Sequence, residues 1–148
     1  MIKYVSGDIL RANTEYIAHG VATGSQQGAD TVLAAQISKR FPEVQKHFRQ
    51  FTRGNKFQGG DLFIVAPARN RPGFIYIATK PESNDLSTSF LNRGLRKLER
   101  YCVKNKIKSV SLPRLESGPD RLNWELDVQP LIEKYLDDQS TDFYVYDM

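Results

Sequence analysis

Apolar residues follow two patterns along this chain, and each pattern predicts one kind of secondary structure. Short apolar or alternating runs, bounded by glycine, proline or polar residues, are typical of strands. They cover residues 2–5, 16–21, 62–66, 74–78, 108–112 and 142–146. Asn70, Pro72 and Gly73 predict a turn that joins the third and fourth of these runs.

Helical spacing appears between the runs. Apolar residues recur every four positions at Ala29, Leu33, Ile37 and Phe41, before Pro42. A second helical segment is predicted over residues 44–51, and a last one over residues 128–136. A long helix is expected from residues 85–87 to about 105, with a buried stripe formed by Leu91, Leu95, Leu98 and Cys102.

The order strand, strand, helices, strand pair, helix, strand, helix, strand favours an α/β fold. Elements that alternate in this way bury a sheet between helices. We therefore expect a three-layer α/β/α architecture with a mixed central sheet. A chain of this size can bury one proper core, so we expect a single domain over residues 1–148.

Composition narrows the class of protein without identifying it. The chain has 148 residues, a formal net charge of +4 and no apolar run of membrane-spanning length. Cys102 is the only cysteine, which excludes an internal disulfide and a cysteine-based zinc site and is typical of a reducing compartment. His19 and His47 are too scattered to indicate a metal centre. We expect a cytoplasmic protein (nuclear if eukaryotic) that is monomeric, does not bind membranes and needs no metal or cofactor.

The loop over residues 112–124 carries the most informative chemistry. It follows a predicted strand and leads to a helix, and it contains Gly118, Pro119 and Asp120. Open α/β sheets bind ligands at such loops, where backbone amides can hold phosphate. Asp120 would then face the ligand as a carboxylate able to move a proton. The alternative is a helix-entry loop with an incidental acid.

A second loop of small and flexible residues runs from Gly24 to Asp30, after the strand at 16–21. Small residues let backbone amides approach an anion closely. Glycine loops are common, so this one indicates a phosphate site only in combination with other features. Asp8 also follows a strand, where it either belongs to a turn or accepts hydrogen bonds from a purine amine or a ribose hydroxyl.

Two further polar positions and one helix face each allow a structural and a functional interpretation. His19 is more typical of a hydrogen-bonded core residue than of a catalyst. Lys80 lies at a strand end because Pro81 cannot continue a sheet, and it is either solvated or a nucleophile at a pocket mouth. Basic residues on the long helix either form a solvated face or contact nucleic acid; they are Arg93, Lys97, Arg100 and Lys104.

Several separated segments together resemble the macrodomain family. They are residues 4–10 with Gly7-Asp8, residues 17–21 with His19-Gly20, Gly28-Ala29 before a helix ending at Phe41-Pro42, residues 77–80 with Thr79-Lys80, and residues 112–124. The Thr-Lys and Gly-Pro-Asp-Arg-Leu-Asn-Trp segments are most similar to the terminal ADP-ribose protein glycohydrolase branch, which groups with the Alc-type macrodomains. The resemblance spans nearly the whole chain in the right order.

The resemblance implies a pocket for ADP-ribose. Asp8 matches the family aspartate beside the adenine, and two phosphate-binding loops would offer amides to the diphosphate. The residues that it places at the ligand are Asp8, Ile9, Val21, Gly24, Gln27, Gly28, Ala29, Ser117, Gly118 and Pro119.

The resemblance also implies catalytic roles. In this branch the lysine that matches Lys80 is the nucleophile toward the distal ribose, and the aspartate that matches Asp120 assists as acid and base. The chain departs from the family at Gly28-Ala29-Asp30, where a third glycine is usual, so Asp30 is either a second catalytic candidate or a loop adaptation. Glu116 adds a negative charge to the second phosphate loop.

These features predict a hydrolase that removes mono-ADP-ribose from a carboxylate side chain or a nucleobase. Its partner would be ADP-ribose or an ADP-ribosylated macromolecule, with nucleic-acid contact through the basic helix face as an option. The alternatives are a non-catalytic ADP-ribose reader, an ADP-ribose 1″-phosphatase and an O-acetyl-ADP-ribose deacylase.

Overall fold

The centre of the fold is strand β2 (Tyr16–Ala22), which pairs in parallel with two neighbours, β4 (Gly73–Lys80) and β5 (Ser109–Pro113). The computed structural model describes residues 1–23, 32–80, 88–115 and 122–147. The other strands are β1 (Ile2–Val5), β3 (Leu62–Val65) and β6 (Asp142–Tyr146). The six-stranded sheet has the order β1-β6-β5-β2-β4-β3, and β3 alone runs antiparallel to its neighbour. The sheet is therefore mixed, as predicted.

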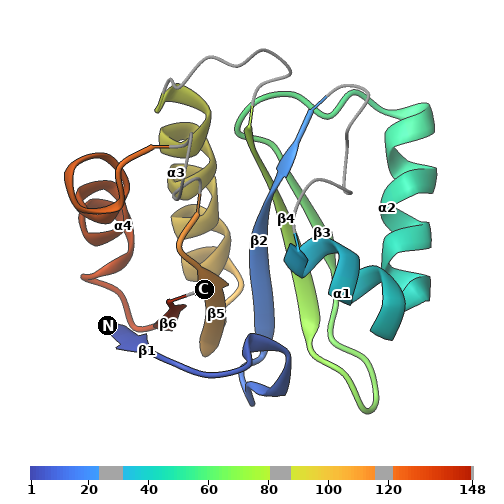
Figure 1. The fold of residues 1–148 in the computed structure, drawn as a ribbon, viewed down its shortest axis with the longest axis horizontal. Coiled ribbons are helices and arrows are strands. Elements are labelled where there is room, and N and C mark those ends of the chain that lie inside the picture. Colours follow the sequence, from blue (N-terminus) through green and yellow to red (C-terminus); the bar gives the residue numbers. More distant parts are fainter. Residues whose placement is uncertain (24–31, 81–87, 116–121, 148) are drawn as a thin grey trace.

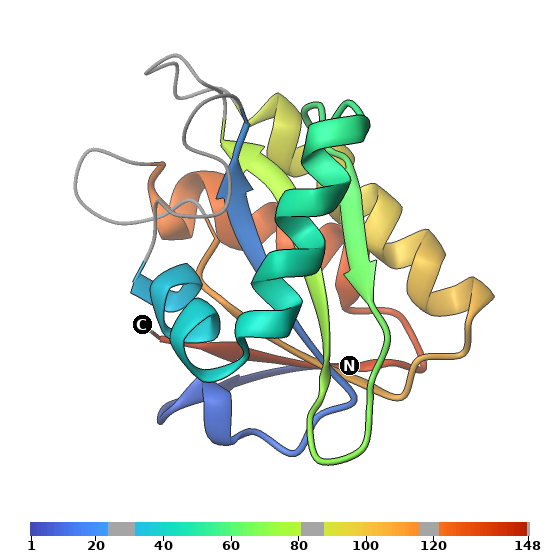
Figure 2. The ribbon, with the colours of Figure 1, turned by 90° about the vertical axis from the view of Figure 1, so that its right-hand side faces the viewer.

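Helices cover both faces of this sheet. Helices α1 (Val32–Arg40) and α2 (Pro42–Gly54) lie on one face, and α3 (Ser89–Lys104) and α4 (Gln129–Leu136) lie on the other (Figure 1). The view in Figure 2 places α1 and α2 in front of the sheet. The expected three-layer α/β/α architecture is confirmed.

Strand β4 shows why the central strands are continuously apolar. Successive side chains of a strand point to opposite faces. Phe74, Tyr76 and Ala78 pack in the cluster on the α1/α2 face, whereas Ile75 and Ile77 pack in the cluster on the α3/α4 face. Because helices bury both faces, no position of the strand interior needs a polar side chain.

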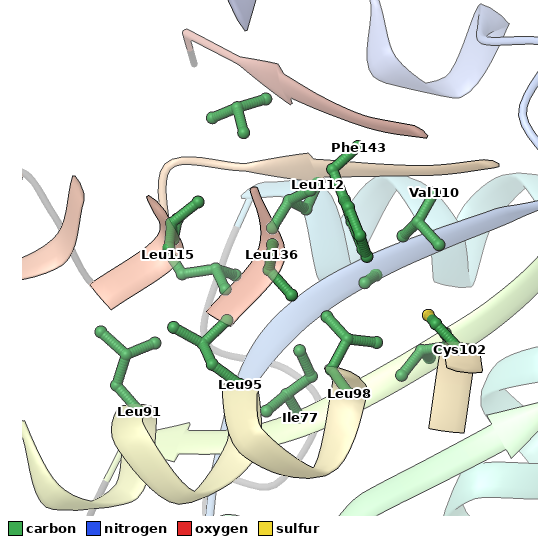
Figure 3. Close-up of a cluster of buried hydrophobic side chains, with 14 of the residues drawn as sticks. Ile77, Leu91, Leu95, Leu98, Cys102, Val110, Leu112, Leu115, Leu136 and Phe143 are labelled. Atoms are coloured by element: carbon green, nitrogen blue, oxygen red, sulfur yellow. The ribbon is translucent and has the colours of Figure 1, made fainter. Parts of the chain in front are cut away.

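The stripe predicted for the long helix forms the core between α3, α4 and the sheet. Leu91, Leu95 and Leu98 are fully buried. Figure 3 shows them pointing from α3 toward side chains of β5, α4 and β6, among them Leu112, Leu136 and Phe143. Cys102 ends this stripe, and burial raises the pKa of its thiol to about 12. The thiol is therefore neutral at pH 7 and does not act as a nucleophile.

Most predicted boundaries hold within two or three residues, and β1 and β6 have the predicted bounds. The helix predicted over residues 128–136 is confirmed as α4, which begins one residue later, and the π-helix η3 (Trp124–Val128) that precedes it was not predicted. Asn123 caps η3, because its Oδ1 accepts a hydrogen bond from Leu126 N at 2.9 Å. The 3-10 turn η1 (Ile9–Arg11) was not predicted.

Among the described helices, none is long and apolar enough to cross a bilayer.

Phe48 of α2 should contribute strongly to stability. Its side chain is fully buried and stacks on the Tyr76 ring with centroids 4.3 Å apart. We expect Phe48→Ala to lower the free energy of unfolding by about 3–5 kcal/mol. The neighbouring Arg49 is exposed, so Arg49→Ala should change it by less than about 0.5 kcal/mol. Urea denaturation measures both, and equal losses for the two variants would contradict the assignment of the buried face of α2.

Candidate functional site

The carboxyl ends of β5, β2 and β4 form the natural ligand position of this sheet. These three strands are adjacent and parallel, so their carboxyl ends meet at one edge. The chain leaves β2 for α1 on one face, but leaves β4 for α3 and β5 for α4 on the opposite face. Ligands of open α/β sheets bind where the chain departs to opposite faces in this way.

Lys80 lies at this edge, as the last residue of β4. It is half-buried and pairs in register with Ala22, and its carbonyl oxygen accepts a hydrogen bond from Thr23 N at 3.1 Å. The predicted strand end is confirmed. The register shifts by one residue between the pairs Val21–Ala78 and Ala22–Lys80, so Thr79 is an extra residue on β4 and regular alternation does not extend from Ala78 to Lys80.

Gly20 holds β2 close to the residue before Lys80. Thr79 is 1% exposed, and a Cβ on Gly20 would collide with its Oγ1. A larger residue at position 20 would therefore displace the end of β4. The sequence offered a signal for this contact, since a glycine inside a strand often marks a close approach, but the sequence analysis did not use it.

Asp8 and Ile9 lie in the turn after β1. Asp8 is exposed, and its Oδ1 accepts a hydrogen bond from Leu10 N at 3.0 Å, which caps η1. Ile9 and Val21 are fully buried and belong to one apolar cluster on the α1/α2 face. These contacts match the turn interpretation of Asp8, and its placement beside an adenine stays a prediction.

The described residues on either side of the Asp120 loop are packed together. Leu115 and Leu122 are buried in the same cluster as α3 and α4. The guanidinium of Arg114 lies 5.0 Å from the centroid of the Trp124 ring. Both ends of the loop are therefore fixed on the core, at the carboxyl end of β5.

The remaining predicted ligand and catalytic residues lie outside the described residues. They are Gly24, Gln27, Gly28, Ala29, Asp30, Ser117, Gly118, Pro119 and Asp120. By sequence, they belong to the segments that follow β2 and β5, the strands on either side of the position described above.

His19 lies within the core of the α1/α2 face, as expected. It is 1% exposed, and its ring centroid lies 4.4 Å from that of Tyr76. Burial raises the pKa of Tyr76, whose neutral hydroxyl donates a hydrogen bond to Gln45 Oε1 at 2.9 Å.

Across the described ranges, no three histidine, cysteine, aspartate or glutamate side chains gather in a group that could hold a metal ion.

The segment before β3 is tied to the end of β4. Gly60 N donates to Ala78 O at 2.8 Å, and Ala78 N donates to Asp61 O at 2.9 Å. Burial raises the pKa of the Asp61 carboxyl, but hydrogen bonds from Lys97 Nζ and Gln58 N outweigh this effect and hold the pKa below its usual value. Asp61 is therefore a carboxylate at neutral pH, and it links this segment to α3.

Comparison with known proteins agrees with this geometry. No protein-family model matches the sequence. The chain is 28% identical over 147 residues to the human ADP-ribose glycohydrolase OARD1, covering 98% of this chain and 90% of the relative. It is also 28% identical over 149 residues to a DNA ADP-ribosyl glycohydrolase of Mycobacterium tuberculosis, covering 99% of this chain but only 42% of the relative.

Solved structures show the same fold. The macrodomain of Thermus aquaticus DarG superposes with a TM-score of 0.85 at 21% identity, covering 100% of this chain and 99% of that one. Thermosipho africanus DarTG in complex with ADP-ribose superposes with a TM-score of 0.84 at 22% identity, covering 99% of this chain and 41% of that one.

The chain therefore has the macrodomain fold, as the sequence resemblance implied. In sequence, the chain is similar to relatives named as an ADP-ribose glycohydrolase and a DNA ADP-ribosyl glycohydrolase.

The contact between Gly20 and Thr79 yields a stability prediction. Gly20→Ala should lower the free energy of unfolding by about 1–3 kcal/mol, because the new methyl group overpacks a buried contact. The loss should shrink in a Thr79→Ala background, where the opposing Oγ1 is absent. Gly54→Ala is the matched control: nothing lies within 4 Å of its added Cβ, so stability should not fall. Additive losses in the double variant would contradict the contact.

Proposed function

We propose that the protein is an ADP-ribose-binding hydrolase that releases mono-ADP-ribose from a modified carboxylate side chain or nucleobase. The observation that supports it best is Lys80 at the carboxyl end of β4, beside the point where the chain departs from β2 and β5 to opposite faces. The nearly full-length similarity to relatives named as ADP-ribose and DNA ADP-ribosyl glycohydrolases supports it further.

The ligand would lie across the carboxyl ends of β2, β4 and β5. Backbone amides of the segments after β2 and β5 would hold the diphosphate, including those of Gly28 and Gly118, and Asp8 would accept hydrogen bonds from the adenosine part. Amides suit this role because they bind phosphate without adding charge to the pocket. The distal ribose would then face Lys80.

Lys80 would act as the nucleophile. Its uncharged amine attacks C1″ of the distal ribose, so a bond forms between Nζ and C1″ while the bond from C1″ to the acceptor breaks. The acceptor leaves with the electron pair, and Asp120 takes the proton that the nitrogen loses. Water then adds to C1″ and gives up one proton to the departed acceptor or to solvent. The bond between C1″ and Nζ breaks, and Asp120 returns its proton to the nitrogen, which releases ADP-ribose and restores the amine.

Asp30 is the second carboxylate of this proposal. It follows Gly28 and Ala29, so it would lie beside the diphosphate and the distal ribose. A carboxylate is repelled by phosphates unless it contacts the sugar hydroxyls or the attacking water. In that position Asp30 would orient water for the second step.

We propose a cytoplasmic or nuclear location for this activity.

The test measures ADP-ribose freed from two substrates, an ADP-ribosylated glutamate peptide and an ADP-ribosylated single-stranded DNA. The wild-type protein should release ADP-ribose from at least one of them. Lys80→Ala should abolish release, and Asp120→Ala should slow it by about 10²–10⁴-fold, the usual contribution of a positioned acid or base. Both variants should still bind ADP-ribose in calorimetry.

Lys134→Ala is the matched control, because Lys134 is an exposed lysine of α4 and its loss should leave turnover unchanged. ADP-ribose binding without release from any substrate would identify a reader instead. Phosphate released from ADP-ribose 1″-phosphate, or acetate from O-acetyl-ADP-ribose, with Lys80 dispensable, would identify a phosphatase or a deacylase. Absence of ADP-ribose binding would overturn the whole proposal.

A further inference from the structure

One exposed face of α2 carries a regular series of cations. Lys46, Arg49 and Arg53 are spaced three and four residues apart, so they lie in one row along the helix, and Lys56 follows just beyond its end. All four side chains are exposed. The first three line a shallow hollow of about 300 Å³, and Arg53 and Lys56 line the next hollow, of about 470 Å³. We call these four residues the α2 track.

The α2 track is not neutralised by nearby acids. Within residues 1–23, 32–80, 88–115 and 122–147, none of its four cations forms an ion pair. Other cations do: Arg71 Nε lies 3.3 Å from Glu43 Oε1, and Lys97 Nζ lies 2.8 Å from Asp61 Oδ1. Glu43 is also the only acid in the sequence from 32 to 58, which contains six lysines and arginines. The track therefore presents uncompensated positive charge.

The surroundings of the track favour a polyanion over a protein partner. Stable protein interfaces have an apolar core and few lysines. The large hydrophobic residues that are exposed in the described structure lie elsewhere, at Met1, Tyr4, Val32, Val103 and Leu126. Nucleic-acid interfaces, in contrast, are polar and strongly basic, and cations that neutralise successive phosphates provide most of the affinity.

The track leads toward the candidate site. The carboxyl end of α2 lies toward the same end of the molecule as the carboxyl ends of β2 and β4 (Figures 1 and 2). Beyond Lys56, Phe57 packs edge-on against Phe48, and Gly60 N donates to Ala78 O, two residues before Lys80. Lys80 is the last residue of β4, so the end of the track and the proposed nucleophile lie toward the same end of the molecule.

We propose that the α2 track binds the phosphodiester backbone of an ADP-ribosylated single-stranded nucleic acid whose modified nucleotide occupies the candidate site. The inference rests on the proposed function, which already includes a nucleobase acceptor, and adds the surface that binds the strand carrying it. The ADP-ribose part would be held by the loops of the site, and the flanking strand would run along α2. Base stacking is not required, because phosphate contacts alone give binding that is independent of sequence.

The test compares four proteins that differ in charge at chosen places. The track variant carries Lys46→Ala, Arg49→Ala, Arg53→Ala and Lys56→Ala. A dispersed control loses the same four charges at the exposed residues Lys3, Arg96, Lys108 and Lys134. A third variant carries Arg93→Ala, Arg100→Ala and Lys104→Ala on α3. Each is assayed with ADP-ribosylated single-stranded DNA, ADP-ribosylated glutamate peptide, free ADP-ribose and an unmodified fluorescent oligonucleotide.

In the wild type, affinity for the oligonucleotide should fall with salt by about 0.7 log units per tenfold salt for each phosphate neutralised. The track variant should lose about four such contacts, so its salt slope should flatten by roughly 3. Its KM for modified DNA should rise at least about tenfold at low salt, with kcat little changed. Its affinity for free ADP-ribose and its turnover of the peptide should stay at the wild-type level.

Three results would overturn the inference: wild-type behaviour of the track variant on DNA, an equal loss in the dispersed control, or a loss that appears only in the α3 variant. Release from the peptide but not from DNA would leave the proposed function intact and refute the acceptor class. Oligonucleotide binding that depends on the track, without release from any substrate, would instead count against the proposed hydrolase activity.

Discussion

The parallel pairing of β2 with β4 and β5 is the constraint on which the site depends. Three adjacent strands with a common direction bring their carboxyl ends to one edge, and burial of both faces forces the chain to leave them for helices. Because β2 leads to one face and β5 to the other, this edge is the position at which open α/β sheets bind their ligands. The position of the site therefore follows from topology before any catalytic side chain is considered.

Strand alternation then links the chemistry to a particular surface. Tyr76 and Ala78 lie on the α1/α2 face of β4, just before Lys80, and Phe48 anchors α2 against Tyr76 on that face. The same helix turns its other side to solvent, where Arg49 and Arg53 lie. One amphipathic helix thus fixes the core beneath the candidate nucleophile and provides the cations proposed to bind its substrate.

Local patterns in the sequence predicted the elements well, but not the contacts between distant segments. The spacing of Leu91, Leu95 and Leu98 identified the buried stripe of α3, and Pro81 correctly marked Lys80 as a strand end. The collision that excludes a side chain at Gly20 depends on Thr79, a neighbour only after β2 and β4 pair. Similarly, the sequence drew attention to the basic face of α3, whereas Lys97 there pairs with Asp61 on a segment far away along the chain. The proposed partner of Lys80, Asp120, rests on the family resemblance, because pairing of two such residues leaves no local pattern.

The distribution of charge favours one side of the molecule for the approach of a polyanion. Residues 122–147, which form η3, α4 and β6 near the β1 edge of the sheet, contain seven acids and one lysine. The β3 edge is flanked instead by α2 and α3, whose exposed charged residues are mainly basic. A polyanion is repelled from the first edge and attracted to the second, over about one Debye length in physiological salt, roughly 8 Å. A modified strand would therefore meet the carboxyl ends of the sheet from the β3 side, where its backbone encounters α2 before its ADP-ribose reaches Lys80. The diphosphate itself would need no such field, because the proposed backbone amides would bind it at short range. Recognition of the ligand and recruitment of the strand that carries it would then depend on different physical interactions.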